Sequence, residues 1–167
     1  NNTVTSIYID KNDNKWLTPI NSGLLLYKDN YWKEINSKNS KLPKDHIMSF
    51  FADDKGVFWI GTLPGSGLIK VDDTVWTFYT EINSTIPTSG VSSITQDTKG
   101  NIWFAGFDSD LQKYIPMGLI KFDGKNFIHF HTENSPLSTN DITIIATEKN
   151  GNIWLGTNFD GLILLKE

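Results

Sequence analysis

The stretch Asn150-Gly151-Asn152-Ile153-Trp154-Leu155-Gly156-Thr157 decides the fold, because related stretches occur three more times in the same chain. Each copy carries one Trp, and successive Trp residues lie 43, 44 and 51 residues apart. The other copies are Lys15-Trp16-Leu17-Thr18, Phe58-Trp59-Ile60-Gly61-Thr62 and Ile102-Trp103-Phe104-Ala105-Gly106. Self-similarity at a nearly fixed period is the signature of a repeat architecture.

Each copy is followed by a Gly-Leu pair that opens a further predicted strand. The pairs are Gly23-Leu24, Gly67-Leu68, Gly118-Leu119 and Gly161-Leu162. We expect four short strands per repeat: a first at 4–10, 47–52, 91–96 and 142–147, a second with the Trp, a third after the Gly-Leu pair and an aromatic fourth at 31–33, 75–79 and 127–130. Four strands in about 43 residues are typical of one β-propeller blade.

The predicted fold is therefore all-β, with four antiparallel propeller blades in a single domain at 1–167. The blades are expected at about 3–43, 44–87, 88–137 and 138–167, and the last lacks its outer strand. A four-stranded sheet with two apolar faces must stack against neighbouring sheets. We expect Trp16, Trp59, Trp103 and Trp154 to fill the layers between blades as the structural core.

The third copy carries a pattern that resembles the two-component regulator propeller repeat. Asp97 precedes Gly100-Asn101-Ile102-Trp103, and Gly118-Leu119 and the link Asn134-Ser135-Pro136-Leu137 follow. The first copy departs from the pattern, with Asn14-Lys15 and then Pro19. The resemblance implies the sensory region of a bacterial hybrid histidine kinase or a related exported protein, located in the periplasm or outside the cell. These are framework positions, so they identify no ligand.

Composition excludes several functions. The chain of 167 residues has a net charge of −4 and no basic stripe, which disfavours binding to nucleic acid. It has no Cys, and therefore no disulfide or thiolate chemistry. No apolar run approaches the roughly 18 residues of a membrane span, so we expect no membrane insertion within this chain.

Candidate metal and catalytic residues are few. His129 and His131 share one face of a predicted strand, but no third ligand is evident nearby. The segment Asp10-Lys11-Asn12-Asp13-Asn14 imitates the start of a calcium loop, yet Lys15 stands where that loop needs Gly. We predict an ordinary turn there, no metal and no cofactor. Without a nucleophile or phosphate-loop motif, we predict that the protein is not an enzyme. A streptogramin-lyase-like enzyme is the alternative that a loose resemblance leaves open.

The connection between the second and third strands varies most among the copies, and it is longest at 107–117. Loops carry function while the scaffold carries stability. We therefore predict a non-catalytic sensory module that binds a saccharide, another polar ligand or a partner domain at this end of the blades. The predicted ligand-binding residues are Asp108, Asp110, Gln112, Tyr114, Asn158, Asp160 and His46. A purely structural or protein-interaction propeller is the alternative.

Closure of the ring stays open at this stage. A stack of four blades leaves one apolar face uncovered at each end unless the ring closes. The blades could belong to a larger propeller, could associate with a second chain through these open blade edges, or could form a strained ring of four.

Overall fold

The computed structural model describes residues 3–111 and 113–166. The fold is all-β, with antiparallel sheets arranged as the four blades of a propeller, as predicted. Each sheet follows the order of the chain, so every connection within a blade is a hairpin. Blade 1 contains β1 (Val4–Ile9), β2 (Lys15–Pro19), β3 (Leu24–Lys28) and β4 (Tyr31–Ile35). Blade 2 contains β5 (Ile47–Ala52), β6 (Phe58–Thr62), β7 (Leu68–Asp72) and β8 (Val75–Tyr79).

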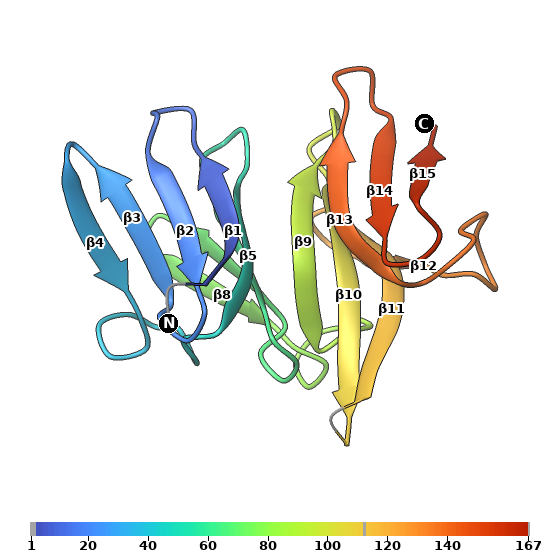
Figure 1. Cartoon of the computed structure of the whole chain (residues 1–167), viewed down its shortest axis with the longest axis horizontal. Helices are drawn as coiled ribbons and strands as arrows, with labels where there is room; N and C mark the ends of the chain where they lie inside the picture. The colour runs from blue at the N-terminus through green and yellow to red at the C-terminus, as the bar shows by residue number, and fades with distance from the viewer. Residues whose placement is uncertain (1–2, 112, 167) are drawn as a thin grey trace.

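Blade 3 contains β9 (Gly90–Gln96), β10 (Ile102–Asp110), β11 (Lys113–Phe122) and β12 (Phe127–Phe130). Blade 4 has three strands, β13 (Ile142–Thr147), β14 (Ile153–Thr157) and β15 (Leu162–Leu165). Blades 1 and 4 lie at opposite sides of the molecule, with β5 and β9 between them (Figure 1). The described residues include no helix of the length and apolarity that a membrane crossing requires.

The insertion at 107–117 is not the loop that we predicted. β10 runs on to Asp110 and β11 already begins at Lys113, so the two strands continue as a hairpin beyond the edge of the other blades. The pairing of Asp108 with Ile115 and of Ser109 with Tyr114 extends the ladder. The hairpin projects downward in Figure 1.

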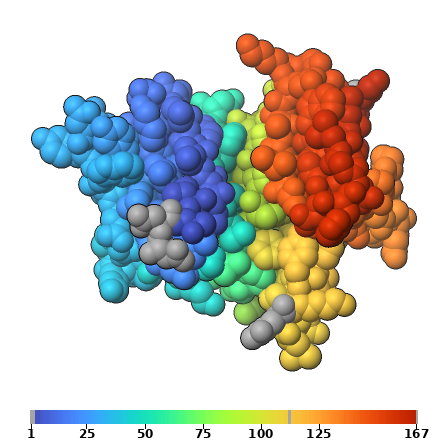
Figure 2. All heavy atoms as spheres, in the orientation of Figure 1, coloured from blue at the N-terminus to red at the C-terminus, as the bar shows by residue number. Residues whose placement is uncertain are grey.

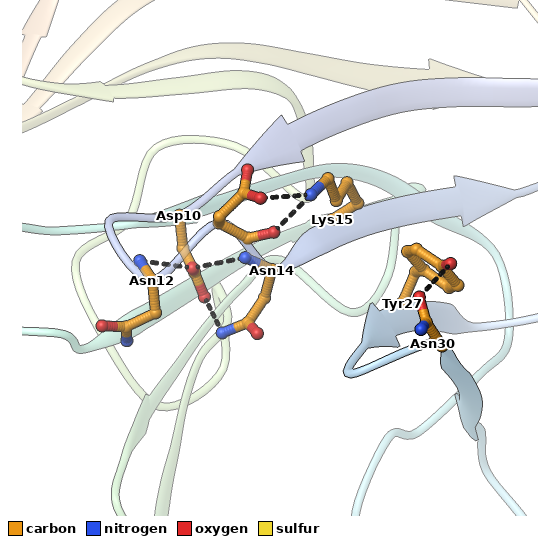
Figure 3. Close-up of polar contacts among 7 residues, drawn as sticks. Asp10, Asn12, Asn14, Lys15, Tyr27 and Asn30 are labelled. Atoms are coloured by element: carbon orange, nitrogen blue, oxygen red, sulfur yellow. Dashed lines mark hydrogen bonds and ion pairs between the residues drawn. The ribbon is translucent and has the colours of Figure 1, made fainter.

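The turn between the first two strands of each blade is closed by one carboxylate. Asp10 accepts hydrogen bonds from the backbone N–H groups of Asn12 (2.9 Å) and Asn14 (3.0 Å) and from Asn14 Nδ2 (2.9 Å), as Figure 3 shows. Its second oxygen accepts a bond from Trp16 Nε1 at 3.1 Å. The predicted ordinary turn is thus a tight turn organised by Asp10, and the same carboxylate holds the indole ring of the next strand.

In blades 2 and 3, Asp53 and Asp97 likewise accept bonds from backbone N–H groups of the turn and from the indole of the next strand. In blade 4, Glu148 accepts bonds from the side chains of Asn152 and Trp154. We call Asp10, Asp53, Asp97 and Glu148 the turn carboxylates. Burial raises the pKa of Asp97, but hydrogen bonds from Trp103, Asn101 and Lys99 outweigh it and leave that pKa below its ordinary value. Each of the four Trp residues therefore has its polar N–H satisfied, and the rings of Trp16, Trp59 and Trp103 pack in apolar layers, as burial of an indole requires.

Three apolar cores lie between successive blades. Trp16 and Leu24 of blade 1 pack with Phe50, Ile60 and Ile69 of blade 2. Corresponding cores join blade 2 to blade 3 and blade 3 to blade 4. The indole rings do not all end up equally covered: Trp16, Trp59 and Trp103 are buried, whereas Trp154 of the last blade is half-buried.

Candidate functional site

The innermost strand of each blade has a β-bulge near its start. The register between the first two strands shifts at the same place in all four blades, so that the inner strand carries an extra residue. A bulge locally re-aims a side chain away from the regular pleat. The bulge residues that line one common cavity are Thr5, Met48, Ser92 and Thr143.

This axial cavity has a volume of about 490 Å³ and is completed by Phe107, Tyr114 and Asn158. All four blades therefore contribute to it. It lies at the end of the blades where the inner strands begin and where the β10–β11 hairpin projects. Figure 2 shows the middle of the chain, in green, between blade 1 in blue and blade 4 in red. The lining consists of hydroxyls, an amide, a thioether and aromatic rings, without a charged side chain.

Tyr114 and Asn158 meet at one carboxylate on the rim of the cavity. Asn158 Nδ2 donates to both oxygens of Asp141 at 2.9 Å. Tyr114 is hydrogen-bonded to the same carboxylate, and its ring lies 5.5 Å from that of Phe107. Burial and the negative charge of Asp141 raise the pKa of Tyr114 to about 12, so the phenol is neutral at physiological pH. The rim thus presents an oriented phenol and an oriented amide.

The structure thus places two of the predicted ligand-binding residues, Tyr114 and Asn158, at this cavity. A third, Asp108, instead accepts bonds from the backbone N–H (2.6 Å) and the hydroxyl (2.7 Å) of Ser89 and holds the hairpin against the preceding link. Asp110 is exposed near the tip of the hairpin.

The remaining predicted residues are scattered. Asp160 is exposed, and its backbone N–H donates to Thr157 Oγ1 at 2.9 Å. His46 is half-buried in the link before β5 and is not among the residues that line the cavity. Gln112 lies outside the described residues.

The histidine pair does not belong to this cavity. His129 and His131 have ring centroids 4.9 Å apart at the end of β12, and both are half-buried. The ring Nε2 of His129 contacts the backbone carbonyl of Met117. Among residues 3–111 and 113–166, no group of three His, Cys, Asp or Glu side chains has a metal-binding arrangement.

A second cavity, of about 530 Å³, opens at the opposite end, between blades 1 and 2. It is larger than the axial cavity, and its polar lining includes the turn carboxylates Asp10 and Asp53. Both carboxylates are already engaged by their own turns and by Trp16 and Trp59. We therefore place the candidate site at the axial cavity, where the polar groups are not required for turn formation.

Sequence reasoning missed Asp141 and the four bulge residues. Asp141 lies in an ordinary link, and only folding brings it beside the hairpin of another blade. The bulge residues differ in type from copy to copy, so self-comparison does not single them out. The insertion at 107–117 was visible in the sequence, because its length distinguishes the third repeat from the others.

Comparison with known proteins agrees with this architecture. A sequence model of the family described as two component regulator propeller matches residues 41–63, 85–108 and 136–159. These segments contain Trp59, Trp103 and Trp154. The first repeat, where Lys15 and Pro19 depart from the pattern, is not matched. No curated protein matches the chain.

Solved structures of low sequence identity share the fold. The extracellular domain described as that of the hybrid two component system BT3049 from B. thetaiotaomicron is 24% identical, with a TM-score of 0.73 over 93% of this chain and 20% of that chain. The corresponding domain of BT4673 is 20% identical, with a TM-score of 0.59 over 96% of this chain and 27% of that one. Virginiamycin B lyase from Staphylococcus aureus is 15% identical, with a TM-score of 0.66 over 97% of this chain and 55% of that one.

The chain therefore spans about a fifth to a half of the length of these structures. At these identities the likeness shows the fold alone. With four Trp-bearing blades and the turn carboxylates in evidence, three of the four repeats of this chain match the repeat described as two component regulator propeller.

Proposed function

We propose that this chain is a non-catalytic recognition module of an extracytoplasmic sensor, and that it binds a neutral, polyhydroxylated ligand such as a saccharide at the axial cavity. The observation that carries the proposal is the convergence of Tyr114 and Asn158 on Asp141 at the rim of a cavity lined from all four blades. Ligand sites combine apolar walls with a few fixed polar groups, and this cavity has that composition.

The charge of the lining favours a neutral ligand. An anion would need a cationic side chain or a set of free N–H donors, and the lining residues include no Lys or Arg. The hydroxyls of Thr5, Ser92 and Thr143 donate to backbone carbonyl groups, so their oxygens are left to accept hydrogen bonds from hydroxyl groups of a sugar. The Asn158 Oδ1 can accept in the same way, since its Nδ2 donates to Asp141. The aromatic rings of Phe107 and Tyr114 offer an apolar surface for the C–H face of a sugar ring.

The extracytoplasmic location is part of the proposal. It is supported by the family of the repeats and by the two structural neighbours described as extracellular domains of two component systems. In such a protein, ligand binding between blades would change how the propeller contacts the rest of the receptor. This chain contributes recognition in that scheme and no chemistry.

A test is binding of the chain to an oligosaccharide array, followed by calorimetry with any saccharide retained. Tyr114→Phe and Asn158→Ala should each weaken binding by about fivefold or more, because each removes one hydrogen-bonding group from the rim. Tyr31→Phe is the matched control, since this phenol is 77% exposed on β4 and is not among the cavity-lining residues. Retention of full affinity by both rim variants would place the ligand elsewhere, and failure of every saccharide to bind would contradict the ligand class.

A further inference from the structure

The cavity of about 530 Å³ between blades 1 and 2 has both of its walls within the described chain. Blade 1 supplies residues of the sheet face that bears Trp16, and blade 2 supplies the opposing face with Ala52 and Phe58. A blade that preceded blade 1 would pack on the other face of that sheet. The cavity is therefore internal to an interface whose two halves are both in this chain.

Three aromatic side chains line this cavity: Tyr8, Trp16 and Phe58. The Tyr8 hydroxyl donates to the carbonyl of Ala52 at 2.8 Å, and the rings of Trp16 and Phe58 have centroids 4.9 Å apart. A corresponding cavity between blades 2 and 3 has only about 260 Å³, and Ile102 stands there at the position of Phe58. The first interface thus has the larger space and one more ring beside it.

The residue that pairs across the sheet with the Trp also differs between the blades. In blade 2 it is Lys70, whose Nζ lies 6.0 Å from the ring of Trp59. In blade 3 it is Lys121, whose Nζ lies 5.1 Å from the ring of Trp103. An ammonium so placed is attracted by the π electrons of the indole. In blade 1 the partner is the uncharged Leu26, so this interface keeps the aromatic wall without the lysine that accompanies it in the other two.

The charges that line the cavity are arranged with the negative ones deeper. Asp10 is half-buried and Asp53 is buried, whereas Lys11 and Lys28 are both exposed. A third carboxylate, that of Asp54, is exposed with the lysines. A cation that enters between the aromatic rings therefore approaches carboxylates and leaves the lysines at the mouth.

Asp10 attracts a cation but has no acceptor site left for it. One oxygen accepts from the backbone N–H groups of Asn12 and Asn14, and the other accepts from Asn14 Nδ2 and Trp16 Nε1 (Figure 3). These bonds use the roughly four lone pairs of a carboxylate. Burial raises the pKa of Asp10, but the hydrogen bonds outweigh it and leave the pKa below its ordinary value, so the group is ionised at neutral pH. A cation without N–H groups suits such a site.

We propose that the cavity between blades 1 and 2 binds a quaternary ammonium, a small organic cation whose nitrogen carries alkyl groups instead of hydrogens. Its alkyl groups contact Tyr8, Trp16 and Phe58, and its charge replaces the lysine ammonium of the other two interfaces. Aromatic side chains recognise quaternary ammonium groups in this way. The site is independent of the axial cavity, which lies at the opposite end of the blades and shares no residue with it.

The experiment compares choline with neohexanol, its neutral analogue in which a carbon atom replaces the nitrogen. Each probe is titrated into the chain, and binding is followed by NMR at the indole N–H of Trp16, which donates to Asp10 at 3.1 Å. Choline should bind at least about fivefold more tightly, because it alone carries the charge. Equal affinities would overturn the proposal, because the cavity would then select shape and not charge. A Trp16 resonance that choline does not move would overturn it as well.

Two substitutions install residues that other blades already carry at the same positions, so the fold is retained. Leu26→Lys introduces the lysine of blades 2 and 3 and should weaken choline binding at least about fivefold, because an ammonium of the chain then competes with the ligand. Phe58→Ile introduces the residue of blade 3 and should weaken binding about threefold, because one ring is lost. Ile82→Lys is the control with the same change of charge, since Ile82 is 97% exposed in a link and should leave the affinity unchanged.

Unaltered choline affinity in Leu26→Lys would place the ligand elsewhere and contradict the proposal. Saccharide binding is measured on the same variants, and it should persist in both, because neither residue lines the axial cavity. A failure of the quaternary ammonium site is thereby distinguished from a failure of the proposed function.

Discussion

Trp103 and Trp154 occupy the same framework position in successive blades, yet their surroundings differ. Trp103 is 7% exposed, stacks on Phe130 with centroids 5.5 Å apart, and has Lys121 Nζ 5.1 Å from its ring. Trp154 donates to its own turn carboxylate, Glu148, at 2.6 Å, but its ring is only half-buried. The hydrogen bond within the blade is therefore local, whereas burial depends on the blade that follows. The same residue of the repeat is therefore buried where another blade packs on it and half-buried where none does.

The largest expected effect is a difference between two alanine substitutions at these positions. Trp103→Ala should lower the free energy of unfolding by about 3–5 kcal/mol, because it leaves a cavity inside a packed core. Trp154→Ala should cost about 2 kcal/mol or less, since its ring is partly in water before the substitution. Urea denaturation at a concentration at which the chain is monomeric measures both. Equal losses would show that the indoles stabilise the blades through their turns rather than through packing between sheets.

A pair of glycines, one in blade 2 and one in blade 4, tests the same contrast between a covered and an uncovered blade in the backbone. Gly67 and Gly161 open the third strands of blades 2 and 4, with φ of +65° and +71°. A Cβ on Gly67 would lie 2.1 Å from the carbonyl oxygen of Tyr79, whereas a Cβ on Gly161 would have no neighbour within 4 Å. Gly161 lacks that neighbour because residues 3–111 and 113–166 supply no fourth strand to blade 4, so the two glycines differ in surroundings and not in conformation.

Both alanine variants bear the strain of a left-handed backbone, about 1–2 kcal/mol. Gly67→Ala also introduces the clash with Tyr79, and we expect its free energy of unfolding to fall by about 3 kcal/mol or more. The free energy of unfolding of Gly161→Ala should fall only by the cost of the backbone strain. Thermal or urea unfolding of the two variants separates these contributions. A loss at Gly161 as large as that at Gly67 would indicate that a further strand covers the edge of β15 in solution.

The contrast between blade 3, which has a blade on either side, and blade 4 also explains which features could be predicted from the sequence. Repetition of Trp, of the Gly-Leu pair and of the turn residues reveals the blade, because each of these is required once per copy by local geometry. Repetition cannot reveal which copy another blade will cover, and Trp154 occupies the same position in the repeat as the other three although it is the least buried of the four. The axial cavity escaped prediction for a related reason, since Thr5, Met48, Ser92 and Thr143 share a bulge rather than a residue type.

The extended hairpin shows the limit of reasoning from loops. The segment 107–117 was predicted as a loop because its length breaks the period, but two antiparallel strands satisfy its backbone groups better than an irregular loop would. The functional expectation that an insertion marks the binding end is independent of that error. Tyr114 reaches the cavity because it sits on a regular strand that holds its direction.

The smallest predicted effect concerns this same Tyr114, and it tests whether the hairpin and blade 4 meet as a preorganised rim. Its pKa of about 12 in the folded chain lies above the ordinary value of 10.0, because burial and the charge of Asp141 both oppose ionisation. A raised pKa in the folded state means that this stabilising contribution is complete below pH 10 and is lost as the pH rises through 12. Ultraviolet titration of phenolate formation should therefore show a late transition that Tyr114→Phe removes and Tyr31→Phe retains.

Asp141→Asn separates the effect of burial on the Tyr114 pKa from the effect of the carboxylate, since the variant removes the charge and keeps a side chain of the same size. If the carboxylate contributes as the rim geometry indicates, the Tyr114 transition in this variant moves toward pH 10 but does not reach it, because burial persists. An unchanged transition would mean that partial burial alone raises the pKa of Tyr114, without a contribution from Asp141. The hairpin would then pack on blade 4 without orienting the phenol, and the amide of Asn158 would be left as the one positioned group at the mouth of the cavity.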